Sequence, residues 1–357
     1  LVQRNSFRLG RNVDAMPISI YDIAKIAGVS PSTVSRALED HPRIGAETKK
    51  RIQDLAREMG YIPSTAARSL ATRKTWTIGM VLASISDPFM GRVIEGVEQV
   101  AIEAGFNVFI STSQNDRQRE IDVIEMLQKR RVDGIIVLAS HLFDRSSWFY
   151  DRSKVPLVVI NEQHPGKNMH FVAVDDIHGT RLAVEHLISL GHRRIGYVSI
   201  PNRPKSNQFR FKGYQEALTA AALPLDPTLI FTPHTIEDHA QVGAASLEPL
   251  LASGATAVFC YNDTAAIGLL TACYKNGISV PENLSVIGFD DIDMAAYTLP
   301  ALTTIRQPRF ELGQRAMHMM LALLEGEEPE NQTLAGQLVV RQTTTPFLDQ
   351  KQLESAG

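Results

Sequence analysis

Two consecutive series of alternating apolar and amphipathic segments fill most of this chain after residue 76. The short apolar runs have the length of strands, and the longer amphipathic stretches have the spacing of helices. Strand–helix alternation predicts parallel sheets that are covered by helices on both faces. Because the pattern restarts after residue 176, we expect two doubly wound α/β subdomains. The apolar runs are residues 78–83, 107–112, 133–139 and 156–161 in the first series, and 194–200, 228–233, 257–262 and 284–291 in the second.

Residues 19–38 have the pattern of two short helices joined by a tight turn. Ser19 can cap a first helix, with Asp22 three positions later as in a capping box, and Gly28 can end that helix with a positive φ. Ser30 can cap a second helix, with Pro31 at its first position, where the missing N–H costs nothing. The outward face of the second helix then carries Ser32, Thr33, Ser35 and Arg36. Hydroxyls and an Arg on an exposed helix face suit phosphates and base edges in the major groove of DNA.

Several motifs in a fixed order resemble those of the lac/gal repressor family of bacterial transcription regulators. The resemblance covers nearly the whole chain after residue 16. It is carried by SIYDIAKIAGVSPSTVSRAL (19–38), GYIPSTAARSLA (60–71), SISDPFMG (84–91), VDGIIVLAS (132–140), GHRRIGYV (191–198), CYND (260–263), VIGFDD (286–291) and PALTTIRQP (300–308). It implies a small all-α helix-turn-helix head on a body that resembles a periplasmic sugar-binding protein.

The resemblance also implies a division of the chain into domains. Residues 1–15 match nothing in the family and are expected to be disordered, since they hold few core-forming residues. We expect a DNA-binding head at 16–62, a hinge helix and linker at 63–76, and an effector-binding and dimerisation domain at 77–348. Within that domain, the expected N-subdomain is 77–176 plus 306–335, and the expected C-subdomain is 177–305 plus 336–348.

Charge is distributed unevenly along the chain. Residues 16–75 hold ten Lys/Arg and six Asp/Glu, a net +4, and residues 1–15 add +2. The whole chain carries −3, which leaves −9 on residues 76–357. A basic head on an acidic body fits a DNA-binding module on a soluble body, although chance clustering of charge remains open.

Other classes of protein lack support in the sequence. No apolar run is long enough to span a membrane and the chain has no apolar signal core, so we expect a cytoplasmic protein. Phosphate-binding, metalloprotease and hydrolase motifs are absent and the ten His are scattered, so we predict no enzyme, no metal and no cofactor. Cys260 and Cys273 lie in apolar runs and are expected to be buried reduced thiols.

Ligands of open parallel sheets bind beyond the carboxyl ends of the strands, where this chain is rich in Asp and Asn. Fixed carboxylates, amides and an Arg can hold a polyhydroxylated ligand by many hydrogen bonds. Matching to the family ranks the expected effector contacts as Asp290, Arg210, Asp87, Phe89 and Asn262. Alternatives are a turn cap for Asp290, a surface ion pair for Arg210 and a core position for Phe89. Asp263 is expected to cap the helix that follows it.

The resemblance carries over DNA contacts as well. Its base-side residues correspond to Ser32, Thr33 and Arg36, and its phosphate-side residues to Tyr21, Ser30, Ser35, Arg43, Thr48 and Tyr61. Ser64, Ala67 and Leu70 would belong to a hinge helix in the minor groove, with Leu70 as the apolar wedge. The alternative for this segment is a plain linker. The sequence departs from some members at Pro31-Ser32, which leaves the first base contacts and the operator open.

Together these features predict a homodimeric, ligand-responsive repressor that binds a pseudo-palindromic double-stranded DNA operator. We expect a small sugar or sugar derivative as its effector, bound between two subdomains. The alternatives are a corepressor-dependent regulator that binds a purine or other metabolite, and a transport binding protein. A transport protein should carry a signal peptide and no DNA-binding head, and this chain shows the reverse. The sequence leaves open whether the effector acts as an inducer or as a corepressor, and whether the protein forms a dimer or a tetramer.

Overall fold

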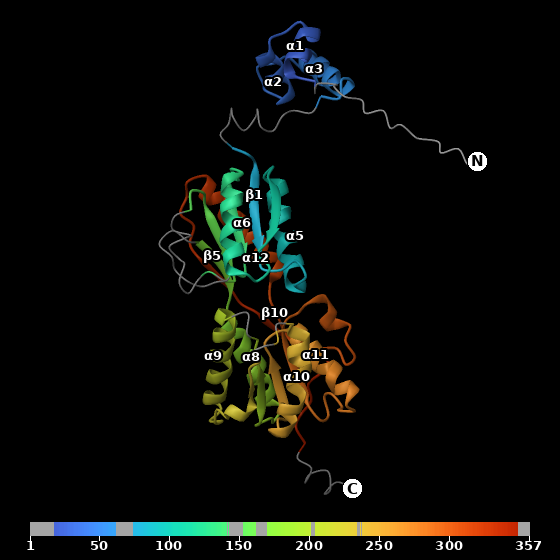
Figure 1. Ribbon diagram of the computed structural model, residues 1–357, viewed down its shortest axis with the longest axis vertical. Coiled ribbons are helices and arrows are strands. Elements are labelled where there is room, and N and C mark those ends of the chain that lie inside the picture. The colour runs from blue at the N-terminus through green and yellow to red at the C-terminus, as the bar shows by residue number, and fades with distance from the viewer. Residues whose placement is uncertain are drawn as a thin grey trace, which may run out of the picture. The chain divides into compact units, whose positions relative to one another are not determined.

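The computed structural model describes residues 18–61, 74–140, 142, 153–161, 170–200, 204–233, 236 and 238–348. The chain forms two compact units, residues 1–75 and residues 76–357 (Figure 1). The described part of the first unit is all-α, and the second unit contains two sheets with helices packed on them. The predicted fold class is therefore confirmed.

Three helices form the described part of the first unit, which we call the head. The caps are those that the sequence predicts. The backbone N–H of Ser19 donates to Asp22 Oδ2 at 2.9 Å, Gly28 has a φ of 66°, and Ser30 Oγ accepts from the N–H of Thr33 at 3.2 Å. A small core joins the helices, formed by Ile23, Ala24, Val34, Ala37, Ile52 and Ala56. The helices are α1 (Ile20–Ala27), α2 (Pro31–Leu38) and α3 (Ala46–Glu58).

The first sheet of the second unit has the strand order β11-β5-β4-β3-β1-β2, and all its pairings are parallel. Successive side chains of β1 enter hydrophobic cores on opposite faces of the sheet. Met80 and Leu82 share a core with α5 and α12, and Val81 shares the other with α6. We call this sheet with its helices the N-subdomain. Its elements are β1 (Thr77–Leu82), α5 (Pro88–Glu103), β2 (Asn107–Thr112), α6 (Arg117–Lys129), β3 (Gly134–Leu138), β4 (Leu157–Ile160), β5 (His170–Val174), α12 (Arg309–Leu324) and β11 (Gln332–Leu334).

The second sheet has the order β12-β10-β9-β8-β6-β7 and is parallel except for β12, which runs antiparallel to β10. Helices α8 and α9 cover one face, and α10 and α11 cover the other, each pair packed side by side (Figure 1). We call this body the C-subdomain. Its elements are α8 (Asp176–Ser189), β6 (Ile195–Val198), α9 (Pro204–Ala220), η1 (Pro227–Leu229), β7 (Ile230–Phe231), α10 (His239–Ala252), β8 (Ala257–Cys260), α11 (Asp263–Lys275), β9 (Ser285–Asp290), η2 (Asp293–Ala296), β10 (Thr303–Arg306) and β12 (Gln337–Val339).

The two subdomains exchange chain segments near the C-terminal end of the sequence. The chain leaves β10 of the C-subdomain at Arg306 and enters α12 of the N-subdomain at Arg309. It returns between β11 and β12. Helix α12 packs closely against α5, because a Cβ on Gly96 would lie 2.1 Å from the backbone oxygen of Phe310 and one on Gly313 would lie 2.1 Å from that of Val93. Contacts this close leave little freedom for the two helices to slide over one another.

Within the described ranges, no helix is long and apolar enough to cross a bilayer. Cys260 and Cys273 are both buried, as the sequence predicts, and neither forms a disulfide among the described residues. No cluster of His, Cys, Asp and Glu suited to a metal ion occurs among the residues that the structure describes.

Candidate functional site

The exposed face of α2 carries the residues that the sequence assigns to DNA bases. Val34 and Ala37 are buried against α1 and α3, which turns Ser32 and Arg36 to the outside. The exposed guanidinium of Arg36 makes no hydrogen bond or ion pair with the described residues of the head, so it is available to a partner. Ser30, Ser32 and Thr33 share hydrogen bonds among their hydroxyls, with Ser30 Oγ 2.8 Å from Ser32 Oγ and 2.9 Å from Thr33 Oγ1. The start of α2 is thus a polar, preformed surface.

The residues assigned to phosphates are distributed over the head and differ in exposure. Tyr21 on α1 is 70% exposed, which is unusual for an aromatic side chain in a small domain. Arg43 is exposed and Thr48 is half-buried at the start of α3. Ser35 Oγ lies 3.5 Å from Glu39, and Tyr61 packs on the edge of the head core. The predicted hinge residues Ser64, Ala67 and Leu70 lie outside the described residues.

A buried guanidinium stands at the centre of the predicted effector site. Arg210, on α9, is 4% exposed. Its Nε donates to Asp176 Oδ1 at 2.9 Å, and its Nη1 donates to the backbone oxygen of Tyr261 at 2.5 Å. Its Nη2 lies 3.7 Å from Asp290 Oδ1. The rings of Tyr261 and Phe289 stack against it, with centroids 4.3 and 3.8 Å from Cζ. The predicted pair Arg210 and Asp290 therefore lies together, and a surface ion pair for Arg210 is excluded.

Asp290 ends β9, and its carboxylate is buried. Besides Arg210, it accepts a hydrogen bond from Gln307 Nε2 at 2.6 Å. Burial raises the pKa of Asp290 to about 7, the nearby Asp87 adds to that rise, and Arg210 opposes it. Burial also raises the pKa of Asp176, against the lowering effect of Arg210. The cluster thus holds an acid that changes charge near neutral pH, next to a cation that does not.

Three other predicted effector residues have structural roles. Asp87 caps α5, since its Oδ1 accepts from the N–H of Phe89 at 3.0 Å. Phe89 itself is 6% exposed and packs in the core of the N-subdomain. Asn262 Oδ1 accepts from the N–H of Ala265 at 3.0 Å, and its Nδ2 lies 2.9 Å from His239 Nδ1. Both ends of the Asn262 amide therefore already have protein partners.

The prediction that Asp263 caps α11 is wrong, because Asn262 is the cap and Asp263 is the first helical residue. Asp263 is fully buried, and its Oδ2 accepts from the N–H of Ile292 at 2.9 Å. Its Oδ1 accepts from Thr304 Oγ1 at 2.5 Å. Asp263 therefore ties the loop after β9 to β10. A preceding Asn competes well for a cap position, so spacing alone did not separate the two residues.

Sequence reasoning missed Asp176, Tyr261 and Gln307 as members of this cluster. Asp176 follows the apolar run of β5, and Tyr261 follows that of β8, so both satisfy the rule that strand ends supply site residues. Gln307 lies in the segment between β10 and α12, where the sequence shows no pattern beyond an X-Pro step. Its Oε1 is buried and has no hydrogen-bond partner among the residues that the structure describes.

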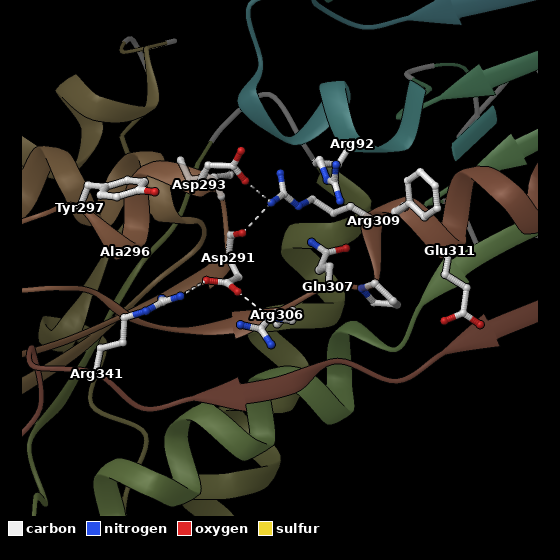
Figure 2. Close-up of a pocket in the computed structure, with 13 residues that line it drawn as sticks. Arg92, Asp291, Asp293, Ala296, Tyr297, Arg306, Gln307, Arg309, Glu311 and Arg341 are labelled. Atoms are coloured by element: carbon white, nitrogen blue, oxygen red, sulfur yellow. Dashed lines mark hydrogen bonds and ion pairs between the residues drawn. The ribbon is translucent and has the colours of Figure 1, made fainter. Parts of the chain in front are cut away.

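A pocket of about 640 Å³ lies beside this cluster, between residues of both subdomains (Figure 2). Figure 2 shows Arg309 pointing toward Asp291 and Asp293, with Arg306 and Arg341 directed at Asp291. Arg306 Nε and Arg341 Nη2 each lie 2.6 Å from an oxygen of Asp291. The lining residues are Arg92, Asp291, Ile292, Asp293, Ala296, Tyr297, Arg306, Gln307, Pro308, Arg309, Phe310, Glu311 and Arg341.

Comparisons with known proteins agree with both units. Residues 19–64 match the bacterial regulatory proteins of the lacI family, and residues 184–344 match a periplasmic binding protein-like domain. The HTH-type transcriptional repressor CytR of Escherichia coli strain K12 is 35% identical over 309 residues, which cover 86% of this chain and 89% of CytR.

Two solved structures are similar over most of their length. The lac repressor dimer bound to operator and the anti-inducer ONPF has a TM-score of 0.83 and 27% identity, covering 92% of this chain and 100% of that one. A LacI family transcriptional regulator from Enterococcus faecium with bound ribose has a TM-score of 0.69 and 31% identity, covering 76% of this chain and 100% of that one. On this evidence the chain belongs to the lacI family of bacterial regulatory proteins.

Proposed function

We propose that this regulator is a homodimeric repressor whose affinity for a pseudo-palindromic operator is set by a small sugar or sugar derivative. The observation that carries the proposal is the buried cluster of Arg210, Asp176 and Asp290 at the carboxyl ends of the C-subdomain strands. A charged cluster this deeply buried is costly to maintain for stability alone. Directed carboxylate and guanidinium groups suit the hydroxyls of a sugar.

The head supplies the DNA-binding end of the proposed function. Ser32, Thr33 and Arg36 on α2 would contact base edges, and a guanidinium can pair with guanine in two hydrogen bonds. The phosphate side would be formed by Tyr21, Ser30, Ser35, Arg43, Thr48 and Tyr61. The preformed hydroxyl surface at the start of α2 supports this assignment.

An apolar edge of the N-subdomain supports the homodimer. Strand β2 is the last strand of its sheet, and it exposes Phe109 by 56% and Ile110 by 42%. Ile102, on the neighbouring α5, is 66% exposed. An uncovered apolar edge strand is a hazard in a monomer and is suited to self-pairing across a two-fold axis. Two heads related by that axis would bind the two halves of a pseudo-palindrome.

A sugar suits the cluster better than the alternative purine. A planar base would need an accessible aromatic face. Among the described residues of the cluster, however, the rings of Tyr261 and Phe289 are buried against Arg210, and Phe89 is in the core. The ribose bound to the related Enterococcus faecium regulator adds support from the family. Effector contacts would then come from Asp290 and Arg210, with Asp87, Phe89 and Asn262 as further candidates.

A thermal-shift screen of the full chain tests the effector. The panel is D-ribose, D-galactose, cellobiose, glucose 6-phosphate, adenosine and hypoxanthine. A ligand at about 100 times its Kd should stabilise the body by about 2.7 kcal/mol. The Asp290→Asn variant should lose that shift, and Arg315→Gln, on the exposed side of α12, should keep it. A thermal shift with hypoxanthine alone would favour a purine over a sugar as the effector. An undiminished thermal shift in Asp290→Asn would show that Asp290 is not an effector contact.

The hinge assignment has a separate test. Leu70→Ala should weaken binding of a selected operator duplex, because the apolar wedge in the minor groove is lost. The same variant should keep its thermal shift with the effector. Operator affinity equal to that of the wild-type protein would contradict the hinge role and favour a plain linker.

A further inference from the structure

Residues 306–309 connect the two subdomains. Three of their side chains bond to the acidic segment 290–293 at the end of β9, which we call the acidic loop. Arg306 Nε pairs with Asp291 Oδ2 at 2.6 Å, and Gln307 Nε2 donates to Asp290 Oδ1 at 2.6 Å. Arg309 donates to the backbone oxygen of Asp291 at 2.7 Å (Figure 2). The connection between the subdomains is therefore also what holds the loop that carries Asp290.

Arg309 differs from the other two because its guanidinium joins both subdomains. Its Nη2 also donates to Asp293 Oδ1 at 3.2 Å, and its Nη1 donates at 3.3 Å to the backbone oxygen of Pro88, the first residue of α5. The residue is 8% exposed. Among the described residues, no other Arg bonds both the start of α5 and the loop after β9.

The two sides that Arg309 joins are firmly attached to different sheets. Arg309 is the first residue of α12, which is packed against α5 with no room for a Cβ at Gly96 or Gly313. Pro88 and Arg309 therefore move as parts of one body. Asp291 and Asp293 follow β9 and move with the C-subdomain. A relative movement of the subdomains must stretch or break the bonds of Arg309 to this loop.

The loop itself has an unusual backbone. Asp290 has a φ of 120° and Asp291 a φ of 53°, values that residues with a side chain rarely adopt. Such conformations persist where surrounding contacts hold them. Gln307, Arg306 and Arg309 supply holding contacts from the connection between the subdomains, and Arg341 and Asp263 add contacts to Asp291 and Ile292 from within the C-subdomain. The pocket of about 640 Å³ borders the same groups, so the guanidinium has space into which it can move.

We propose that Arg309 is a positioning residue that couples the placement of Asp290 to the relative position of the two subdomains. This inference rests on the proposed function, since it describes how the effector cluster communicates with the rest of the regulator. When the subdomains move, Arg309 pulls on or releases the loop that carries Asp290. Conversely, a ligand that engages Asp290 changes the bonds that Arg309 makes and so biases the movement.

A merely structural role for Arg309 makes a different prediction. A residue that only fills space could be replaced by an apolar side chain of similar length with no change in the subdomain position. The bonds of Arg309 to neutral backbone oxygens and to the 80% exposed Asp293 side chain are directional contacts, and they exist only in one arrangement of the two bodies. The decisive measurement is thus the subdomain position itself.

Spin labels on the full chain measure that position. Exposed Asp122 on α6 and exposed Thr219 on α9 are replaced by Cys, one in each subdomain. Cys260 and Cys273 are buried and stay unlabelled. Labelled chains are diluted with unlabelled ones, so that only distances within a chain are recorded. Arg309→Met should broaden and shift the distance distribution, and Arg309→Lys should restore part of it. Arg315→Met is the matched control, because Arg315 lies on the same helix and pairs with Glu311 of that helix.

Operator binding without any effector gives the second readout, with a duplex that the wild-type protein has selected from random DNA. Arg309→Met should change its Kd by about fivefold or more, the lower range for coupled sites. Arg315→Met should leave the Kd unchanged. Unaltered distances and an unaltered Kd in a folded Arg309→Met protein would overturn the proposal. If the wild-type protein selects no DNA, the proposed function fails, whereas the distance measurement still decides the role of Arg309.

Discussion

Replacing Arg210 by Met should destabilise the second unit far more than an ordinary loss of an ion pair. Arg210 is 4% exposed, and the side chains of its partners Asp176 and Asp290 are 11% and 8% exposed. Met has an unbranched side chain but no guanidinium, so it removes the cation from the ring of Phe289 and leaves both carboxylates without their buried partner. Removal of one partner from a buried pair typically costs about 3–5 kcal/mol. We expect a loss of that size in the free energy of unfolding at alkaline pH.

The loss of stability in Arg210→Met should be larger at high pH than at low pH. Burial raises the pKa of Asp290 to about 7 and also raises that of Asp176, while Arg210 opposes both shifts. Without Arg210, both pKa values rise further. A carboxyl whose pKa is higher in the folded state contributes stability at low pH that is lost as pH rises through that pKa. At about pH 5, below the pKa of Asp290 in the folded protein, the variant should therefore lose less stability than at alkaline pH.

Urea unfolding followed by tryptophan fluorescence measures this loss. Trp76 and Trp148 are the two tryptophans of the chain, and both belong to the second unit, so the signal reports on that unit alone. Arg306→Met is the control, because Arg306 is half exposed and Asp291 keeps Arg341; it should cost less than about 1 kcal/mol. A deficit for Arg210→Met that is equally large at both pH values would refute the reasoning from buried carboxylates.

Three further predictions concern single residues. The wild-type second unit should lose stability as pH rises from about 4 to about 7, because Asp290 has a raised pKa in the folded state. The contribution of Asp290 to this loss is at most on the order of 4 kcal/mol. In the same urea titrations, Asp290→Asn should make stability depend less on pH. Arg36→Ala should cost about 1–3 kcal/mol of base discrimination at one operator position in competition binding, whereas Arg57→Ala on α3 should not. Gly243→Ala should lower stability by about 1–3 kcal/mol, because the added Cβ would lie 1.8 Å from the backbone oxygen of Ala265. Its control is Gly91→Ala in an exposed turn of α5, where the Cβ meets nothing and calorimetry should show equal or higher stability.

The head could be predicted in detail because its determinants are local. Ser19, Gly28 and Ser30 each act on backbone groups within a few residues of themselves, so their spacing contains the information needed to place both helix ends. The strand ends of the body follow from periodicity, which is also local. Their convergence at one edge of a parallel sheet follows from topology.

Partners within the effector cluster could not be predicted in the same way. Arg210 pairs with Asp176, on a different helix, and Gln307 reaches Asp290 from the segment between the subdomains. These pairs depend on how α8, α9 and β10 are packed, and nothing in the spacing of the residues encodes that distance. Phe89 was uncertain for the same reason, since a ring in the first turn of a helix can face either a ligand or the core.

The adjacent acids Asp290 and Asp291 show how far local reasoning reaches. They are the same residue type at the end of one apolar run, yet Asp290 bonds to Gln307 and approaches Arg210, while Asp291 bonds to Arg306 and Arg341. Their difference comes at the end of β9, where the positive φ values of Asp290 (120°) and Asp291 (53°) end the regular alternation of the strand. Gln307 donates to Asp290, whereas its chain neighbour Arg306 pairs with Asp291. The same four residues that connect the subdomains thus distinguish the acid that faces the effector cluster from the acid that faces the pocket between the subdomains.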